Sequence, residues 1–219
     1  MYLIIILITL ILGLGAQAGI NSQYKKWGSV ASASGLTGYE AARRMLNANG
    51  LEDITIDHIN GSLTDNYDPR SRTLHLSDSS YQSTSVAATA IACHEAGHAV
   101  QHAKGYTPLK VRNAIVPVVN FASNVWLFVL IAGIFLNMLS LVQFAVILYA
   151  CVVVFQLVTL PVEFDASNRA LASIEAMFPL PESQDEGCKK VLRAAAMTYV
   201  AAALGSLLQL LYFIGISRS

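Results

Sequence analysis

Charged residues are scarce in this chain. Asp, Glu, Lys and Arg make up 13% of its 219 residues, whereas 54% of the residues are hydrophobic. A soluble globular domain usually carries about 25% charged residues. The composition therefore indicates a protein that has lipid as part of its solvent, and it excludes a disordered or collagen-like chain.

An excess of basic charge is also lacking. The 14 Lys and Arg residues balance the 14 Asp and Glu residues, so the formal net charge is zero. No basic run and no row of stacking aromatic residues accompanies them, and these are the usual features of a nucleic-acid-binding surface. We therefore expect no nucleic-acid partner.

Cysteine is rare and widely spaced. The chain has Cys93, Cys151 and Cys188, and no two of them form a C-x-x-C pair. This spacing supports neither a disulfide framework nor a cysteine zinc site. We expect all three thiols to be reduced and buried.

Long apolar runs are abundant, and the first lies at the start of the chain. No charge occurs between Tyr2 and Ile20, which is about the length of a transmembrane helix, so we predict the first span at residues 1–20. Ala16-Gln17-Ala18 resembles a signal-peptide cleavage site, which is the competing interpretation. No Lys or Arg precedes the apolar run as a signal peptide requires, so we favour a retained membrane anchor.

Two further apolar segments follow. Residues 115–162 contain no charge and are too long for one span, so they predict a transmembrane helical hairpin with its turn near Asn137–Ser140. Residues 194–216 are also apolar and predict the fourth span. They are rich in Ala and contain Gly205, and such small residues suit close helix packing. The fold class is therefore a mainly α-helical polytopic membrane protein with about four transmembrane helices and both termini on one side.

The basic residues predict the orientation. Every Lys and Arg except Arg218 falls on the side of two polar segments, residues 21–113 and 163–193. Because Lys and Arg near span ends favour the cytoplasmic side, these segments should face the cytoplasm. We expect a multi-pass protein of the cell membrane.

The first polar segment has the pattern of a small α+β unit. Thr37–Glu40 has the form of a capping box, and the helix it opens should end at Asn49–Gly50. Residues Ile54–Ile59 and Arg72–Leu76 alternate in hydrophobicity, which predicts a small antiparallel sheet. An alanine-rich segment at about residues 85–103 predicts another helix.

This last helix carries the sequence His94-Glu95-Ala96-Gly97-His98. Two imidazoles four residues apart share one helix face and can bind one metal ion, and Glu95 can reach a water on that ion as a general base. A catalytic zinc site has three protein ligands and one water. We therefore predict one Zn²⁺ per chain and need a third ligand for it.

The third ligand comes from elsewhere in the chain. The metzincin pattern fails, because Gln101 and Lys104 stand where it needs Gly and His. Glu163 directly follows the hairpin, which returns the chain to the side it left, so Glu163 should share a membrane face with His98. Pro161 predicts the start of a helix with Glu163 in its first turn. His102, one turn beyond His98, is expected to be a partner of a ligand or a helix cap. The rise of about 12 Å over the eight residues from His94 is too long for both histidines to meet one ion.

These residues carry a resemblance that covers the whole chain. His94–His98, followed by Leu160-Pro-Val-Glu-Phe-Asp-Ala-Ser167, resembles the YugP-like family of bacterial membrane zinc metallopeptidases. More distantly the chain is similar to the HtpX and CAAX-prenyl-protein peptidases, in which the third zinc ligand opens an E-x-x-A-D motif. The resemblance implies a zincin-like fold with His94, His98 and Glu163 as zinc ligands and Glu95 as catalytic base.

One position departs from those distant relatives. Ser167 stands where they have the Asp that supports a zinc-bound histidine, so Asp165 or another carboxylate is the candidate for that role. Four residues are candidates for stabilising the oxyanion, and the spacing selects none of them: Arg169, His75, His58 and Tyr67.

The resemblance also implies the substrates. These would be proteins or peptides at the membrane, bound by strand addition to the edge of the sheet, with Arg72–Leu76 as the candidate edge strand. A membrane partner protein or a homo-oligomer stays open. The alternative function is a proteolytically silent scaffold that retains the zinc site, against which the intact Glu95 argues, because a structural zinc needs no base.

Overall fold

The computed structural model describes residues 2–178 and 180–216. Arg218, the one basic residue expected on the opposite side of the membrane, lies outside the described residues. The chain divides into two compact units. We call residues 1–17, 107–161 and 197–219 the helical unit, and residues 18–106 and 162–196 the α+β unit.

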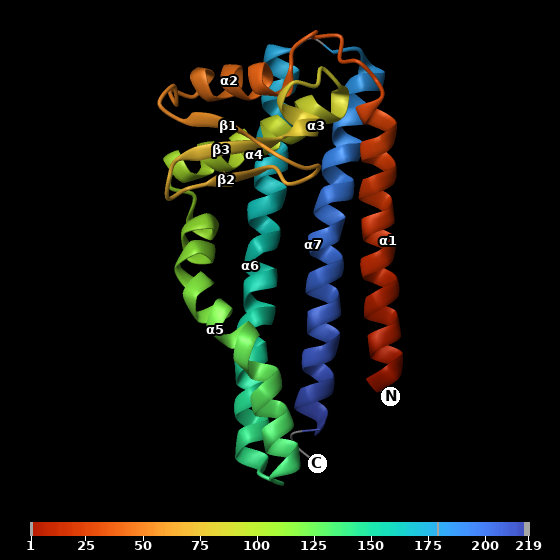
Figure 1. Cartoon of the computed structure of the whole chain (residues 1–219), viewed down its shortest axis with the longest axis vertical. Helices are drawn as coiled ribbons and strands as arrows, with labels where there is room; N and C mark the ends of the chain where they lie inside the picture. The colour runs from red at the N-terminus through yellow and green to blue at the C-terminus, as the bar shows by residue number, and fades with distance from the viewer. Residues whose placement is uncertain (1, 179, 217–219) are drawn as a thin grey trace. The chain divides into compact units, whose positions relative to one another are not determined.

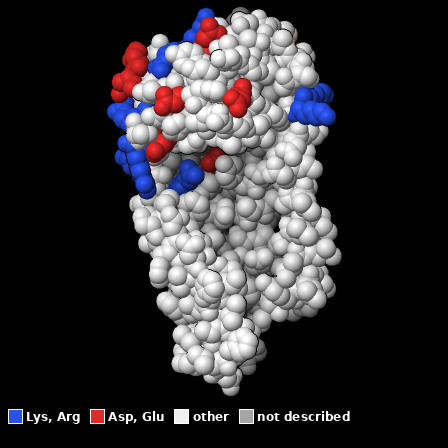
Figure 2. Space-filling model, in the orientation of Figure 1, with Lys and Arg blue, Asp and Glu red and all other residues white. Residues whose placement is uncertain are grey.

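Among the described residues, four long helices are apolar enough to cross a membrane: α1 (Tyr2–Gly28), α5 (Thr107–Phe135), α6 (Leu139–Met177) and α7 (Glu182–Ile216) (Figure 1). In the described part of the helical unit only Lys110 and Arg112 carry a formal charge. Figure 2 shows charged side chains crowded on the α+β unit and an almost uncharged helical unit. The protein is therefore a mainly helical membrane protein, as predicted.

Close backbone contacts hold the helical unit together. The chain reverses between α5 and α6 at Asn137, which has a positive φ of 50°. A Cβ added to Gly133 would lie 2.8 Å from the backbone nitrogen of Val142, so the two helices are in near contact beside the turn. In α7, a Cβ added to Gly205 would lie 3.2 Å from the Cγ2 atom of Thr9 in α1. Small residues thus allow close helix packing, as the sequence indicates.

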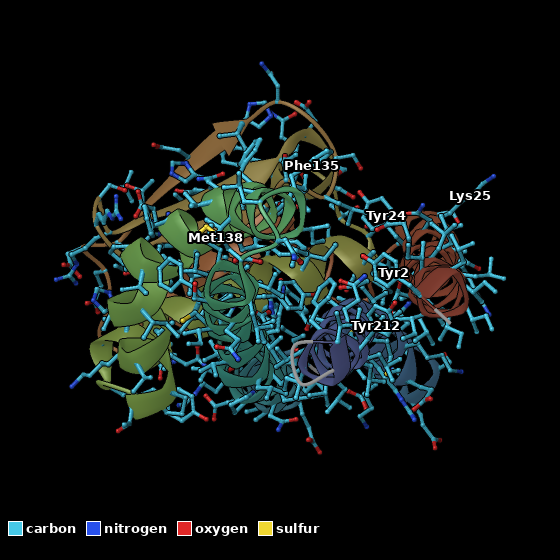
Figure 3. All side chains as sticks on the ribbon, turned by 90° about the horizontal axis from the view of Figure 1, so that it is seen from below. Tyr2, Tyr24, Lys25, Phe135, Met138 and Tyr212 are labelled. Carbon is cyan, nitrogen blue, oxygen red and sulfur yellow. The ribbon has the colours of Figure 1, made fainter. Side chains whose placement is uncertain are left out.

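Aromatic side chains fill another part of the helical unit. The rings of Tyr2 and Tyr212 stack with centroids 4.9 Å apart, and Figure 3 shows these two residues side by side. Trp126 and Tyr149 pack beside Phe213. The Tyr149 hydroxyl also donates a 2.6 Å hydrogen bond to Gln209 Oε1, which satisfies a polar group between α6 and α7.

Helix α6 differs from the sequence prediction at Pro161. We expected a new helix to begin there, but Pro161 lies inside α6, which continues to Met177. The prediction was wrong because an interior proline removes one backbone hydrogen bond, and a long apolar helix tolerates that loss. Glu163 therefore lies inside a continuous helix and not in the first turn of a new one.

The α+β unit contains the predicted capping box. Helix α2 (Gly38–Ala48) opens at Thr37, whose Oγ1 accepts a hydrogen bond from the Glu40 amide, while Glu40 Oε2 accepts one from the Thr37 amide at 2.8 Å. Asn49 caps the helix at its end. The sequence prediction of this helix is confirmed.

In the described part of the chain, the sheet has three strands: β1 (Thr55–Ile59), β2 (Asn66–Asp68) and β3 (Thr73–Ser77), in the order β1-β3-β2. β1 pairs with β3 in parallel, with Thr55 opposite Thr73, and β2 pairs with β3 in antiparallel. The predicted antiparallel pairing of Ile54–Ile59 with Arg72–Leu76 was wrong. The short strand β2 reverses the chain once more, so β3 runs in the direction of β1.

The core of this unit lies between the sheet and two helices. Leu74 and Leu76 of β3 are fully buried with Met45 of α2 and the alanine-rich helix α4 (Val86–Ala103). The short helix α3 (Asp78–Tyr81) lies between β3 and α4 in the chain. Most of α4 is buried, so the motif it carries stands on a rigid support.

The three cysteines are free thiols. Cys93 of α4 and Cys188 of α7 are buried, as expected, whereas Cys151 of α6 is only partly buried.

Candidate metal centre

Three predicted ligand side chains converge in the α+β unit. His94 and His98 come from α4 and Glu163 from α6, and each offers one ligand atom within 4.8 Å of the others. The Nε2 atoms of His94 and His98 lie 3.3 Å and 3.6 Å from Glu163 Oε2. Two imidazole nitrogens and one carboxylate oxygen therefore surround a single point.

The close approach of α4 and α6 depends on a glycine. A Cβ added to Gly97 would lie 2.7 Å from the carbonyl oxygen of Ala166, which is shorter than real contacts of this kind. Gly97 is the fourth residue of the H-E-x-x-H motif, and Ala166 stands three residues after Glu163. The two helices can thus touch at the level of the ligands because neither residue carries more than a methyl group.

The donor set fits zinc. The Glu163 side chain is 3% exposed and each histidine side chain 12% exposed, so the carboxylate is held in a nearly dry place. A buried carboxylate is costly unless it is paired or coordinates a metal. Nitrogen and oxygen donors from three residues are the set that zinc takes when one position stays open for water or substrate.

The charges around His98 change its titration. Burial lowers the pKa of His98, but the Glu163 carboxylate, 3.6 Å from His98 Nε2, and the negative charge of Glu95 outweigh that effect, so the pKa of His98 is raised above the ordinary value. Both histidines must be neutral to bind a metal ion, so metal binding at this site should depend on pH.

Glu95 lies beside the cluster with its carboxylate available. It makes no hydrogen bond to any residue in the described part of the chain, and its side chain is partly exposed. Burial raises the pKa of the Glu95 carboxyl, the neighbouring His98 and His94 lower it, and Glu163 and Asp65 raise it; the net shift is upward. A carboxylate with a raised pKa is a better proton acceptor near neutral pH.

Ser167 supports His94 directly. Its Oγ lies 3.1 Å from His94 Nδ1, the ring nitrogen that faces away from Glu163. Asp165 was the candidate for the role of the missing aspartate, but Ser167 takes the place beside His94. Among the described residues Asp165 forms no hydrogen bond with either histidine and instead accepts hydrogen bonds from Gln101 Nε2 at 2.7 Å and Arg169 Nε at 2.6 Å.

Gln101 is the residue that sequence reasoning missed. It entered only as a departure from the metzincin pattern, yet its Oε1 lies 3.0 Å from Nδ1 of His98. The available signal was its spacing, because residues three apart lie on one face of a helix. A polar residue one turn after His98, on the same face of the helix, was the hint.

The remaining candidates lie in other contacts. His102 Nδ1 pairs with the Tyr67 hydroxyl at 2.9 Å, so His102 supports Tyr67 and is not part of the three-residue cluster. Arg169 binds Asp165, and His58 pairs with Asp78. Among the described residues, none of the four oxyanion candidates forms a hydrogen bond to a residue of the cluster, so none is selected.

The fold and the site define a class. Residues 2–218 match the family described as "Putative neutral zinc metallopeptidase". The chain belongs to this family of zinc metallopeptidases and is a membrane protein.

One relative can be described individually. A protein of Bacillus subtilis (strain 168), described as "Putative membrane protease YugP", is 46% identical over 199 residues, which cover 91% of this chain and 88% of the relative. No solved structure matches the chain.

Proposed function

We propose that this protein is a zinc-dependent metalloendopeptidase with one zinc ion held by His94, His98 and Glu163 and with Glu95 as general base. The observation that carries the proposal is the convergence of three ligand atoms within 4.8 Å beside the Glu95 carboxylate, which forms no hydrogen bond with any described residue. A site that only stabilised the fold would not need such a carboxylate, which argues against the scaffold alternative.

The side chains divide the chemistry among them. Zinc, when bound, makes water more acidic and polarises a peptide carbonyl. The Glu95 carboxylate takes a proton from the attacking water and returns it to the amine that leaves as the peptide bond breaks. His94, His98 and Glu163 hold their positions because Ser167, Gln101 and the contact at Gly97 fix α4 against α6.

The substrates follow from where the site lies along the chain. Glu163 comes directly after the apolar run that ends at Val162, which supports cleavage of proteins or peptides associated with the membrane. The B. subtilis relative is described as a membrane protease. The distribution of Lys and Arg supports a cytoplasmic active site in a multi-pass protein of the cell membrane.

An extended substrate would bind to β2, and not to the Arg72–Leu76 strand that the sequence predicted. Arg72–Leu76 cannot serve, because β3 is the central strand and is paired on both sides. Among the described strands the open edges belong to β1 and β2. β2 is the better candidate, because its Tyr67 is hydrogen-bonded to His102 of α4, the helix that carries the metal ligands.

The test compares wild type with Glu95→Gln in lipid nanodiscs, using a membrane-anchored peptide and its soluble counterpart. Wild type should cleave the anchored peptide faster. Glu95→Gln should retain zinc and lose hydrolysis, because the amide cannot accept the proton.

Glu52→Gln, an exposed substitution of the same kind, serves as the control. Near-normal turnover by Glu95→Gln would reject Glu95 as the base, and zinc binding without any hydrolysis by wild type would favour the scaffold.

A further inference from the structure

A fully buried amide lies behind one of the metal-ligand histidines. Gln101 stands three residues after His98 on α4, and its side chain is 0% exposed. A buried polar side chain must find hydrogen-bond partners, because an unpaired buried group has lost its hydrogen bonds to water without replacement. The partners of Gln101 therefore define what it does.

Both N–H groups of this amide have acceptors. Nε2 lies 2.8 Å from the carbonyl oxygen of Val162 and 2.7 Å from Asp165 Oδ2. Asp165 is held as a carboxylate partner by Arg169, whose Nε donates to the same oxygen at 2.6 Å. A carbonyl and a carboxylate can only accept hydrogen bonds, so the nitrogen end of the amide must face them.

The oxygen end of the amide then has one direction left. Oε1 faces Nδ1 of His98 at 3.0 Å. Because an amide oxygen only accepts, Nδ1 must carry the proton, and Nε2 keeps its lone pair on the side of Glu163 Oε2, 3.6 Å away. The amide thus selects the one neutral form of His98 that can bind a metal through Nε2.

We propose that Gln101 is a positioning residue that fixes the tautomer and ring orientation of His98 and links this ligand to Asp165 and Arg169. This inference rests on the proposed metal site. The same side chain also donates a hydrogen bond to the carbonyl of Val162, the residue before Glu163. It therefore connects α4, which carries the His98 ligand, to α6 directly beside the Glu163 ligand.

The other histidine is supported differently. Ser167 Oγ faces His94 Nδ1, and a hydroxyl can either donate or accept a hydrogen bond. Ser167 alone therefore does not dictate where the proton of His94 sits. Of the two histidines, His98 is the one whose form is set by a group with a fixed hydrogen-bond direction.

The first test uses the zinc-free, full-length protein with ¹⁵N-labelled histidine rings, at a pH where His98 is neutral. Comparison with His98→Ala assigns the His98 signals. Wild type should carry the proton on Nδ1, although free histidine favours Nε2–H. A wild-type protein with the proton on Nε2 would overturn the inference, and this measurement requires no variant of Gln101 to fold.

The second test measures zinc affinity by chelator competition and the absorption spectrum of the cobalt-substituted protein. Gln101→Met fills the same space without hydrogen bonds and should bind zinc about 10–100-fold more weakly, with an altered cobalt spectrum. Gln184→Met is the matched control, because Gln184 also makes two amide hydrogen bonds, to Ala31 and Ala33, but contacts no ligand. Wild-type affinity and spectrum in Gln101→Met would overturn the inference.

The two proposals fail in different ways. If His94→Ala and His98→Ala bind zinc as wild type does, the proposed metal site fails, and the tautomer of His98 in the zinc-free protein still judges the role of Gln101. If those variants lose zinc while Gln101→Met keeps it unchanged, only the role of Gln101 is withdrawn.

Discussion

Substituting Gly97 by alanine should weaken metal binding far more than it weakens the fold. The added Cβ would lie 2.7 Å from the Ala166 carbonyl oxygen, whereas real Cβ atoms stay at 3.0 Å or more, so α4 and α6 must separate by at least about 0.3 Å there (3.0 minus 2.7). Ligand distances in metal sites hold to within about 0.2 Å. The required movement exceeds this tolerance at a contact one residue from His98 and three from Glu163.

The effect on stability should be smaller because two terms oppose each other. Overpacking costs about 1–3 kcal/mol, and replacing a helical glycine by alanine returns about 1 kcal/mol. The free energy of unfolding of the zinc-free protein should therefore fall by about 0–2 kcal/mol. Zinc affinity should fall by about tenfold or more, the scale seen when the support of a ligand is disturbed.

The assay is zinc competition with a chelator on the purified full-length protein, combined with denaturant unfolding of the zinc-free form. Gly19→Ala is the control, because a Cβ at that helical glycine meets nothing within 4 Å, and this variant should keep wild-type affinity. A Gly97→Ala protein that binds zinc as tightly as wild type would refute the claim that this helix contact sets the metal geometry.

Three further predictions concern the ligands, a helix cap and a thiol. Zinc content should fall sharply in Glu163→Ala and little in His102→Ala, because only Glu163 faces both histidines; elemental analysis showing the reverse would remove Glu163 from the site. Thr37→Ala should lower the free energy of unfolding by about 1 kcal/mol and Thr37→Ser should not, since the serine hydroxyl keeps the cap. Burial raises the pKa of the Cys93 thiol, so the reactive thiolate should be scarce even above the ordinary thiol pKa of about 8.5. Iodoacetamide should therefore modify Cys93 only after unfolding, and rapid labelling of the folded protein at pH 9 would contradict this.

Local sequence patterns predicted the features that depend on one helix. His94 and His98 lie one turn apart, so their shared face follows from helix geometry alone. The capping box at Thr37 is equally local, because both of its hydrogen bonds join residues three apart. Glu163 needed one further step, the return of the chain through a hairpin, and the structure brings it to the two histidines.

Features that depend on contacts between distant segments could not be predicted in the same way. β2 has only three residues, Asn66–Asp68, which is too short to show alternation, and missing it reversed the predicted direction of pairing. The roles of Gln101 and Gly97 depend on how α4 lies against α6. Helix α6 runs through Pro161 because its other hydrogen bonds suffice, which a rule based on proline alone does not foresee.

The most direct measurement of the central claim is zinc X-ray absorption on the purified full-length protein, with the metal content determined in parallel. A site formed by His94, His98 and Glu163 should hold one zinc per chain, with two imidazole nitrogens at about 2.0–2.1 Å and carboxylate and water oxygens at about 2.0–2.2 Å. A sulfur ligand at about 2.3 Å, which would implicate Cys93 beside His94, would contradict it. So would a protein that binds no zinc while all three proposed ligands are intact.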